Sequence, residues 1–164
     1  MDDKSAMLKH FLAALAYRTQ KALRDAPEGF ADFSAGMKVR TPHELVRHMD
    51  SVLGYARTHF VGGSYRPRMY AEFKDSIRDF HSVLEDLAKH LEAGTEFLDT
   101  TPERMLQGPF SDAMTHAGQL AMLRRLAGCP VPPENFIVAK ISSENLGPDQ
   151  PQPASPDKEW PEKL

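Results

Sequence analysis

The sequence predicts an all-α protein, a four-helix bundle followed by an extended, proline-rich C-terminal tail. Three observations lead to this prediction. Four segments place apolar residues at spacings of three and four, the pattern of an α-helix with one buried face. Stretches that contain Gly or Pro separate these segments. No internal repeat of fixed period is present, and a length of 164 residues suits one domain.

Composition narrows the class of protein. Twenty Lys and Arg stand against 23 Asp and Glu, with no dense basic run, so nucleic acid is not expected as a partner. No stretch is apolar enough to span a membrane, and the N-terminus does not resemble a signal peptide. The single cysteine excludes an intramolecular disulfide and fits a reducing compartment. We therefore expect a cytoplasmic protein with neither a membrane nor a nucleic-acid partner.

The first helix is predicted over residues 5–26, before Pro27 stops it. Its apolar face comprises Leu8, Phe11, Leu12, Leu15, Thr19, Ala22 and Leu23. Residues 28–40 show no steady period, which predicts a loop that Phe30 and Phe33 hold against the core. This loop is long enough to help shape a pocket.

The second helix has the clearest start in the sequence. Thr41-Pro42-His43-Glu44 combines a Thr cap, a Pro in the first turn and a Glu three residues after the cap, which is a capping box. The helix is expected to end near residue 61, before Gly62-Gly63. His48 lies at the edge of its apolar face. His59 lies about 16 Å further along the axis, too far to share an ion with His48.

The third helix is predicted to open at Arg66-Pro67 and to end at Ala93-Gly94. Packing accounts for its aromatic positions without a cofactor, because they follow the helical period. In the connection that follows, Thr101-Pro102-Glu103 predicts a short helical turn. The residues expected to cover one end of the core are Phe97, Leu98, Met105 and Leu106.

The fourth helix is predicted within the stretch 111–128, with Ser111 as its N-cap and Gly128 as the C′ residue that follows its last turn. Asp112 and His116 lie four residues apart, so both project from one stripe beside the apolar face. That stripe offers two ligands for one metal ion. An ordinary surface pair, with Asp112 stabilised by the helix dipole, explains the same two residues.

After Gly128, Pro130, Pro132 and Pro133 force an extended path. The apolar residues Phe136, Ile137, Val138 and Ile141 are expected to lie along the bundle. We place the bundle domain at residues 1–141 and the tail at residues 142–164, partly docked or disordered, with Trp160 as a late contact.

His48 is the natural third metal ligand, because it flanks the apolar face of its helix as Asp112 and His116 flank theirs. Pairing with Glu44, or a hydrogen bond to the backbone, explains His48 equally well. Three protein ligands would leave a position for water or substrate, as in catalytic sites. Gln119 is expected either to orient water or substrate or to bond at a helix interface.

The other cysteine and histidine positions carry weaker signals. Cys129 follows a helix end and has no neighbouring His, so it predicts a structural or incidental role. The remaining histidines are expected at solvated helix positions: His10, His43, His81 and His90.

Two stretches, TPHELVRHMDSVLGYA and SDAMTHAGQLAMLRRLAG with its proline-rich exit and ENF, resemble the DinB-like superfamily of four-helix-bundle metalloenzymes. The resemblance spans the chain from the first helix to about residue 141. The motif of that superfamily is a His in the second helix and, in the last, a His or Asp and a His four residues apart before Gly-Gln. It falls here on His48, Asp112, His116 and Gly118-Gln119, with Asp in place of the more usual His.

The resemblance implies a divalent metal ion, zinc or nickel first, with iron or manganese as alternatives for this donor set. It also implies a homodimer that acts on a small molecule, for example a low-molecular-weight thiol, by transfer of the thiol-transferase kind or by hydrolysis. The alternative is a non-catalytic helical binding or interaction module whose metal is incidental.

Overall fold

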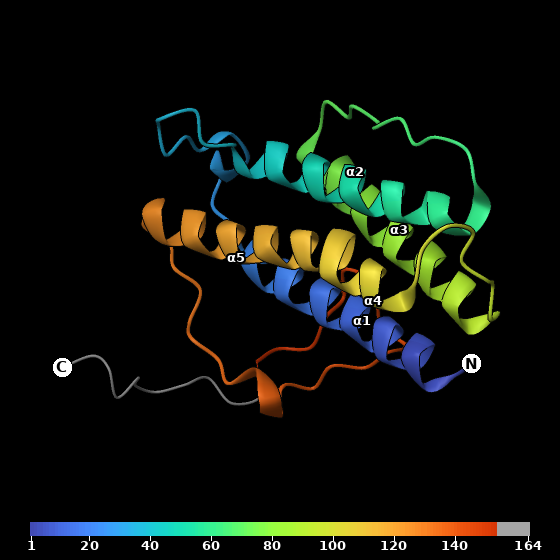
Figure 1. Ribbon diagram of the computed structural model, residues 1–164. Coiled ribbons are helices and arrows are strands. Elements are labelled where there is room, and N and C mark those ends of the chain that lie inside the picture. The colour runs from blue at the N-terminus through green and yellow to red at the C-terminus, as the bar shows by residue number, and fades with distance from the viewer. Residues whose placement is uncertain (154–164) are drawn as a thin grey trace.

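A computed structural model describes residues 1–153 and confirms that the fold of these residues is all-helical. Four long helices carry the fold: α1 (Asp3–Leu23), α2 (Pro42–Val61), α3 (Phe73–Glu92) and α5 (Ser111–Leu126) (Figure 1). The short helix α4 (Pro102–Met105) precedes α5, as Thr101-Pro102-Glu103 predicted. No strand occurs within residues 1–153. Over the same residues, no helix has the length and apolar character needed to cross a membrane.

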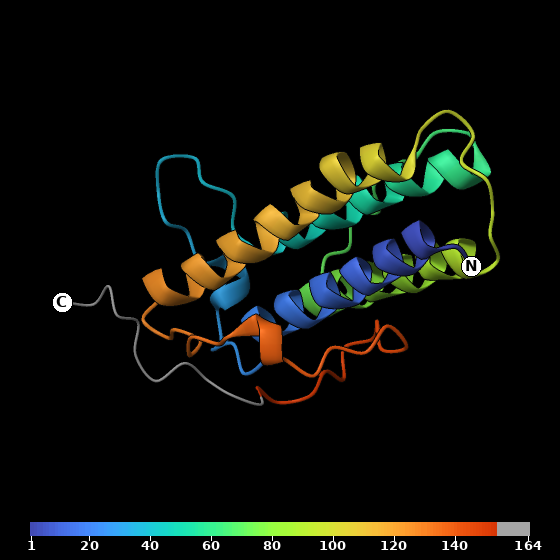
Figure 2. The same cartoon turned by 60° about the horizontal axis from the view of Figure 1, so that its bottom comes forward.

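The four long helices form two layers, α2 with α5 and α1 with α3 (Figure 2). Helices α2 and α3 run in one direction and α1 and α5 in the other (Figure 1). Each helix contacts one neighbour in its own layer and one in the other layer, so α1 and α2 lie diagonally opposite. The core fills the space where the four apolar faces meet, with no solvent exposure at Leu12, Leu53, Phe80, Leu84 and Leu120.

Local capping explains where the helices begin. The capping box at Thr41 and Glu44 is present in full and fixes the start of α2. Helix α1 begins at Asp3, earlier than predicted, because the carboxylate of Asp2 accepts a hydrogen bond from the backbone N–H of Ser5.

The start predicted for α3 was wrong. The helix begins at Phe73, and residues 62–72 form an irregular connection instead. The connection must return along the bundle because α2 and α3 are parallel. It is seated on α2 by the ring of Tyr65, which lies so close to Gly54 that a Cβ there would be 2.2 Å from it.

The predicted N-cap Ser111 was also wrong. A π-helical turn, η2 (Leu106–Phe110), runs directly into α5, so Ser111 already has helical backbone angles. Its hydroxyl donates a hydrogen bond to the carbonyl of Leu106 at 2.6 Å. The predicted end of the helix is confirmed, since Gly128 has a φ of +77° just after the last turn.

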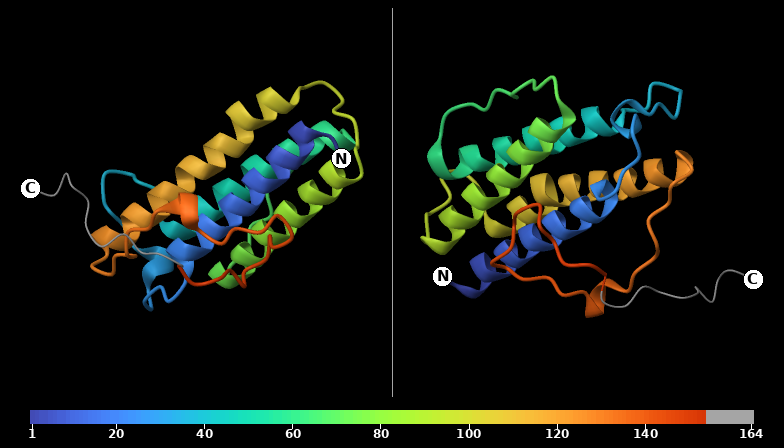
Figure 3. Two further views of the ribbon diagram at one scale, coloured as in Figure 1. Left: turned by 90° about the horizontal axis from the view of Figure 1, so that it is seen from below. Right: turned by 180° about the vertical axis from the view of Figure 1, so that it is seen from behind.

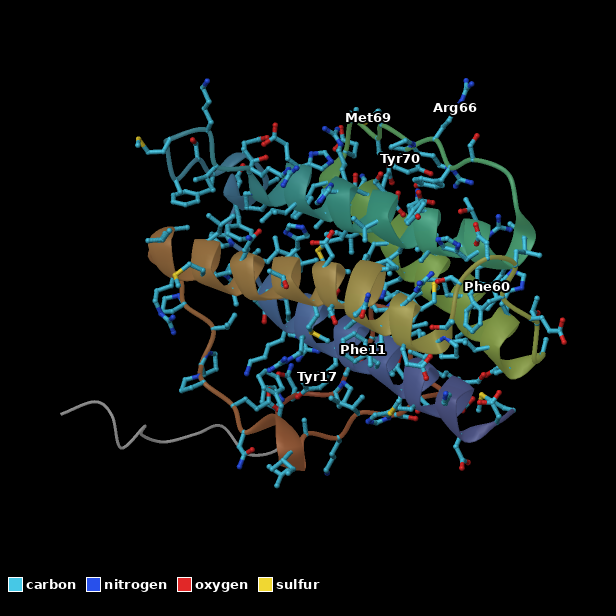
Figure 4. All side chains as sticks on the ribbon, in the orientation of Figure 1. Phe11, Tyr17, Phe60, Arg66, Met69 and Tyr70 are labelled. Atoms are coloured by element: carbon cyan, nitrogen blue, oxygen red, sulfur yellow. The ribbon has the colours of Figure 1, made fainter. Side chains whose placement is uncertain are left out.

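Beyond α5 the chain crosses the outer side of α1 (Figure 3). Phe136 packs edge-on against Tyr17, which lies on the tail-facing side of α1 (Figure 4). The prediction that Ile137 and Val138 lie along the bundle was wrong: Ile137 is 89% exposed and Val138 51%. A tight 3₁₀ turn at Phe136–Val138 accounts for this, because it directs only its first side chain inward.

The later part of the tail makes buried contacts that the apolar pattern did not predict. Leu146 and Gln150 are both buried, and the carbonyl of Leu146 lies 2.6 Å from Nδ1 of His81 on α3. Lys9 on α1 pairs with Glu144 at 2.6 Å. Packing against the bundle therefore continues beyond residue 141. Trp160 falls outside the described residues.

The exposure of Leu98 also differs from the prediction that this residue covers one end of the core. Its side chain is 63% exposed, while Met105 is buried and Phe97 and Leu106 are partly buried against the core. Three of the four residues expected at that end of the core therefore contact it.

Candidate metal centre

The three predicted ligands come together at the groove between α2 and α5. His48 comes from α2, and Asp112 and His116 come from α5. Each offers one ligand atom, and these atoms all lie within 4.8 Å of one another. Within residues 1–153, this is the one group of three or more His, Cys, Asp or Glu residues arranged in this way.

His116 has the most constrained side chain of the three. The residue is 6% exposed, and its Nδ1 lies 2.8 Å from Oε1 of Gln119. A carbonyl oxygen can only accept, so Nδ1 carries the proton and donates, which leaves a lone pair on Nε2 in the neutral ring. Gln119 therefore holds the tautomer in which Nε2 is ready to bind a metal.

The Nε2 atom of His116 is buried and has no hydrogen-bond partner among the described residues. Oδ1 of Asp112 lies 3.3 Å away, but the two atoms are not aligned for a hydrogen bond. An unsatisfied buried polar atom is costly, on the order of 1–3 kcal/mol. A cation between His116 and Asp112 would satisfy this nitrogen.

His48 faces His116 across the groove. The two rings are nearly perpendicular, with centroids 4.7 Å apart. The pKa of His48 is lowered, first by burial and then by the positive charge of Arg40 and by His116, while Asp112 opposes the shift. A lowered pKa favours the neutral imidazole, which is the form that binds metal.

The alternative partners considered for His48 are not present. Glu44 is occupied elsewhere, because its carboxylate accepts a hydrogen bond from the backbone N–H of Thr41 at 2.8 Å. No described residue forms a hydrogen bond with the ring of His48. The ring is therefore free to move toward an ion.

The distances between the ligand atoms fit one metal ion after a small movement of a side chain. Ligand atoms about 2.1 Å from a tetrahedral zinc ion are about 3.4 Å apart. Asp112 and His116 already approach within 3.3 Å of each other, so the adjustment falls on His48, whose side chain is half-buried. The side chain of Asp112 is 50% exposed, which leaves the site open to solvent on that side.

Two depressions flank the three residues along the groove. One is lined by Ser51, Tyr55 and Thr115 together with Asp112. The other is lined by Arg40, Gln119 and further residues of the 28–40 loop and α5. Ala35, Lys38, Val39 and Arg40 of the 28–40 loop line a depression that also includes Gln119, so this loop helps to shape a pocket as predicted.

The structure corrects the prediction for two other histidines. His43 and His81 are buried rather than solvated. Nε2 of His43 lies 2.9 Å from the hydroxyl of Ser76, and His81 bonds to the carbonyl of Leu146. Their partners come from α3 and from the tail, which single-helix periodicity does not place. The sequence offered no signal for these contacts.

Comparisons of the chain with protein-family models, with curated proteins and with solved structures find no match in any of the three.

Proposed function

We propose that this chain is a divalent-metal-dependent enzyme of the DinB-like type. It would transfer a group to or from a small-molecule thiol, or hydrolyse a small molecule, with His48, Asp112 and His116 as metal ligands. The observation that supports this most strongly is the buried, unpartnered Nε2 of His116, fixed by Gln119 and directed toward the other two residues.

Two imidazoles and one carboxylate form a donor set that suits zinc or nickel, with iron and manganese as alternatives. A divalent ion in such a site acts as a Lewis acid and lowers the pKa of a water or thiol that it binds. The protein would hold His116 through Gln119, keep His48 neutral by burial and leave the exposed side of Asp112 open to substrate.

The groove supplies contacts for a substrate on either side of the ligands. The polar residues Ser51, Tyr55 and Thr115 line one depression, and Arg40 adds positive charge at the other. A small molecule with polar or anionic substituents fits these surroundings. The DinB-like resemblance also leads us to propose a homodimer, which light scattering of the purified protein would test.

Metal analysis of protein purified without a chelating tag tests the site. We expect one divalent ion per chain, lost in His48→Ala and retained in His59→Ala. His59 is a matched control because it lies on the same helix, where it contacts Asp99 instead. Metal retained at one equivalent by His48→Ala would refute the site.

Turnover assays separate an enzyme from the non-catalytic alternative. Metal-loaded protein would be mixed with low-molecular-weight thiols and electrophiles, and separately with chromogenic esters, following thiol loss or ester cleavage. We expect activity that His48→Ala lacks and His59→Ala keeps. Metal binding without turnover of any of these compounds would favour a binding module.

A further inference from the structure

A separate cavity of about 320 Å³ lies between α1, α5 and the tail. Small-molecule sites typically have volumes of roughly 300–1,000 Å³. Ala22, Gly118 and Ala121 leave the space open, and residues 131–136 of the tail close one side of it. A Cβ added at Gly118 would meet no atom within 4 Å. The cavity therefore has room for a ligand beside the small residues of α5.

This cavity is not part of the metal centre. Successive residues of an α-helix are about 100° apart, so Gly118 lies about 200° around α5 from His116. His116 faces the groove with α2, whereas Gly118 and Ala121 face the tail. One helix thus contributes to two sites on opposite sides.

The charges around the cavity do not balance. Arg18, Lys21 and Arg125 line it together with one carboxylate, that of Glu134. Glu134 is buried, and its two oxygens accept hydrogen bonds from the hydroxyl of Tyr17 at 2.5 Å and from Lys21 at 2.7 Å. Within residues 1–153, neither arginine forms an ion pair. Lys21 and Glu134 neutralise each other, so the arginines leave the cavity positively charged.

Arg18 is held in place without an anion. Its guanidinium lies over the ring of Phe136, 3.8 Å from the ring centroid, and its one hydrogen bond among residues 1–153 is to the sulfur of Met114 at 3.8 Å. Thioether sulfur is a weak acceptor. Burial lowers the pKa of Arg18, which reflects the cost of removing this cation from water. A carboxylate at this position would offset that cost and match the planar fork of donors.

We propose that this cavity binds a small organic anion with a compact apolar body and a single carboxylate. The carboxylate would contact Arg18, the exposed Arg125 would add positive charge, and the apolar body would lie against Ala121 and the tail residues Val131 and Pro132. Cationic donors in the lining of a cavity that is otherwise largely apolar favour this amphipathic class over inorganic anions or neutral molecules.

Calorimetry of the full chain tests the proposal with two probes of nearly equal shape, phenylacetate and its neutral amide phenylacetamide. A chelator would be present, so that a carboxylate could not bind through a metal ion at His48. We expect phenylacetate to bind at least about tenfold more tightly than the amide, because the neutral amide cannot form an ion pair with the guanidinium of Arg18. Equal affinity of the two probes would overturn the proposal.

Two variants locate the site. Arg18→Gln should weaken phenylacetate binding about tenfold or more, while Arg104→Gln, an exposed arginine of α4, should leave it unchanged. Gly118→Leu keeps both cavity arginines but fills the space, and should reduce binding at least tenfold. The open space at Gly118 and the higher helix propensity of Leu favour a folded variant, which circular dichroism would verify.

Wild-type affinity in Arg18→Gln, or in folded Gly118→Leu, would show that phenylacetate binds elsewhere and would overturn the assignment. Neither result would bear on the metal centre, whose ligands lie on the opposite side of α5 and are tested by metal content.

Discussion

His81 on α3 and His116 on α5 are both buried in the bundle, with 2% and 6% exposure, but their surroundings differ. Both ring nitrogens of His81 have partners: Nδ1 lies 2.6 Å from the carbonyl of Leu146, and Nε2 lies 3.3 Å from the side-chain amide of Gln20, whose NH2 group can donate to the lone pair of the neutral ring. In His116, only Nδ1 has a hydrogen-bond partner, while Nε2 faces His48 and Asp112 unsatisfied.

The comparison separates two uses of a buried imidazole. Where both nitrogens are satisfied by the protein, the ring joins elements, and His81 joins α3 to the tail. Where one nitrogen is oriented and the other is left free beside further donor atoms, the ring is prepared for a ligand. Burial alone does not distinguish the two, because both rings are removed from solvent. The two uses are distinguished by whether each ring nitrogen has a hydrogen-bond partner.

The largest expected effect is on metal affinity in His116→Ala. We expect the affinity to fall more than about 100-fold, because loss of a residue that only supports a ligand already costs about 10–100-fold. His81→Ala should bind metal as the wild type does. Titration of the two variants with zinc against a chromophoric chelator measures the difference. Similar zinc affinity in both variants would remove the distinction between the two histidines.

The next effect is on stability in His81→Ala. This change removes two hydrogen bonds and leaves a void beside Phe80, whose ring contacts that of His81. We expect the free energy of unfolding to fall by about 2–3 kcal/mol. Urea denaturation of the metal-free protein measures it, with His10→Ala as an exposed control on α1. A loss in His81→Ala no larger than in the control would show that the tail contact contributes little.

A smaller effect is expected at Gln119, the residue that orients His116. Gln119→Ala should reduce metal affinity about 10–100-fold, since His116 would lose the acceptor that fixes its tautomer. Gln119→Glu keeps an acceptor there and should retain affinity. Zinc titration compares the two. If both variants lose affinity equally, or neither does, the hydrogen bond to His116 does not prepare the site.

The sequence predicted much of this arrangement because the determining signals are local. The capping box at Thr41 fixed the start of α2, and the spacing of four fixed Asp112 and His116 on one stripe. Helical periodicity placed His48 beside an apolar face, and bundle packing brought the two helices together. The candidate ligands therefore followed from positions within single helices, together with the resemblance.

The features that sequence analysis missed depend on contacts between distant segments. Gln119 is three residues from His116, but its role depends on a side-chain rotamer, and hydrogen bonding at a helix interface explained it equally well. The partner of His81 lies 65 residues away in the tail. Serine is a common helix-cap residue, but η2 continues into α5 without a break at Ser111. The hydroxyl of Ser111 instead donates a hydrogen bond to the carbonyl of Leu106. Periodicity carries no information about such contacts.

The smallest expected effect is on the pH dependence of the free energy of unfolding, to which the titration of His81 contributes. Burial lowers the pKa of His81 below its usual 6.5, while the carbonyl of Leu146 and the carboxylates of Glu85 and Asp149 oppose the shift. Above pH 6.5 the ring is neutral in both folded and unfolded chains, so its contribution to stability is complete. As the pH falls below 6.5, the unfolded chain binds a proton that the folded chain excludes, and stability decreases by at most about 1.4 kcal/mol per pH unit.

Urea midpoints of metal-free protein at pH 7.5 and 5.5 measure this decrease. His43 and His48, whose pKa values are also lowered by burial, contribute in the same direction to the wild type and to any His81 variant. The difference between the wild type and His81→Gln therefore reports His81 alone. We expect the loss of stability between the two pH values to be smaller in His81→Gln. An equal loss in both proteins would mean that His81 takes up its proton without leaving its place between α3 and the tail, contrary to a ring held neutral by burial.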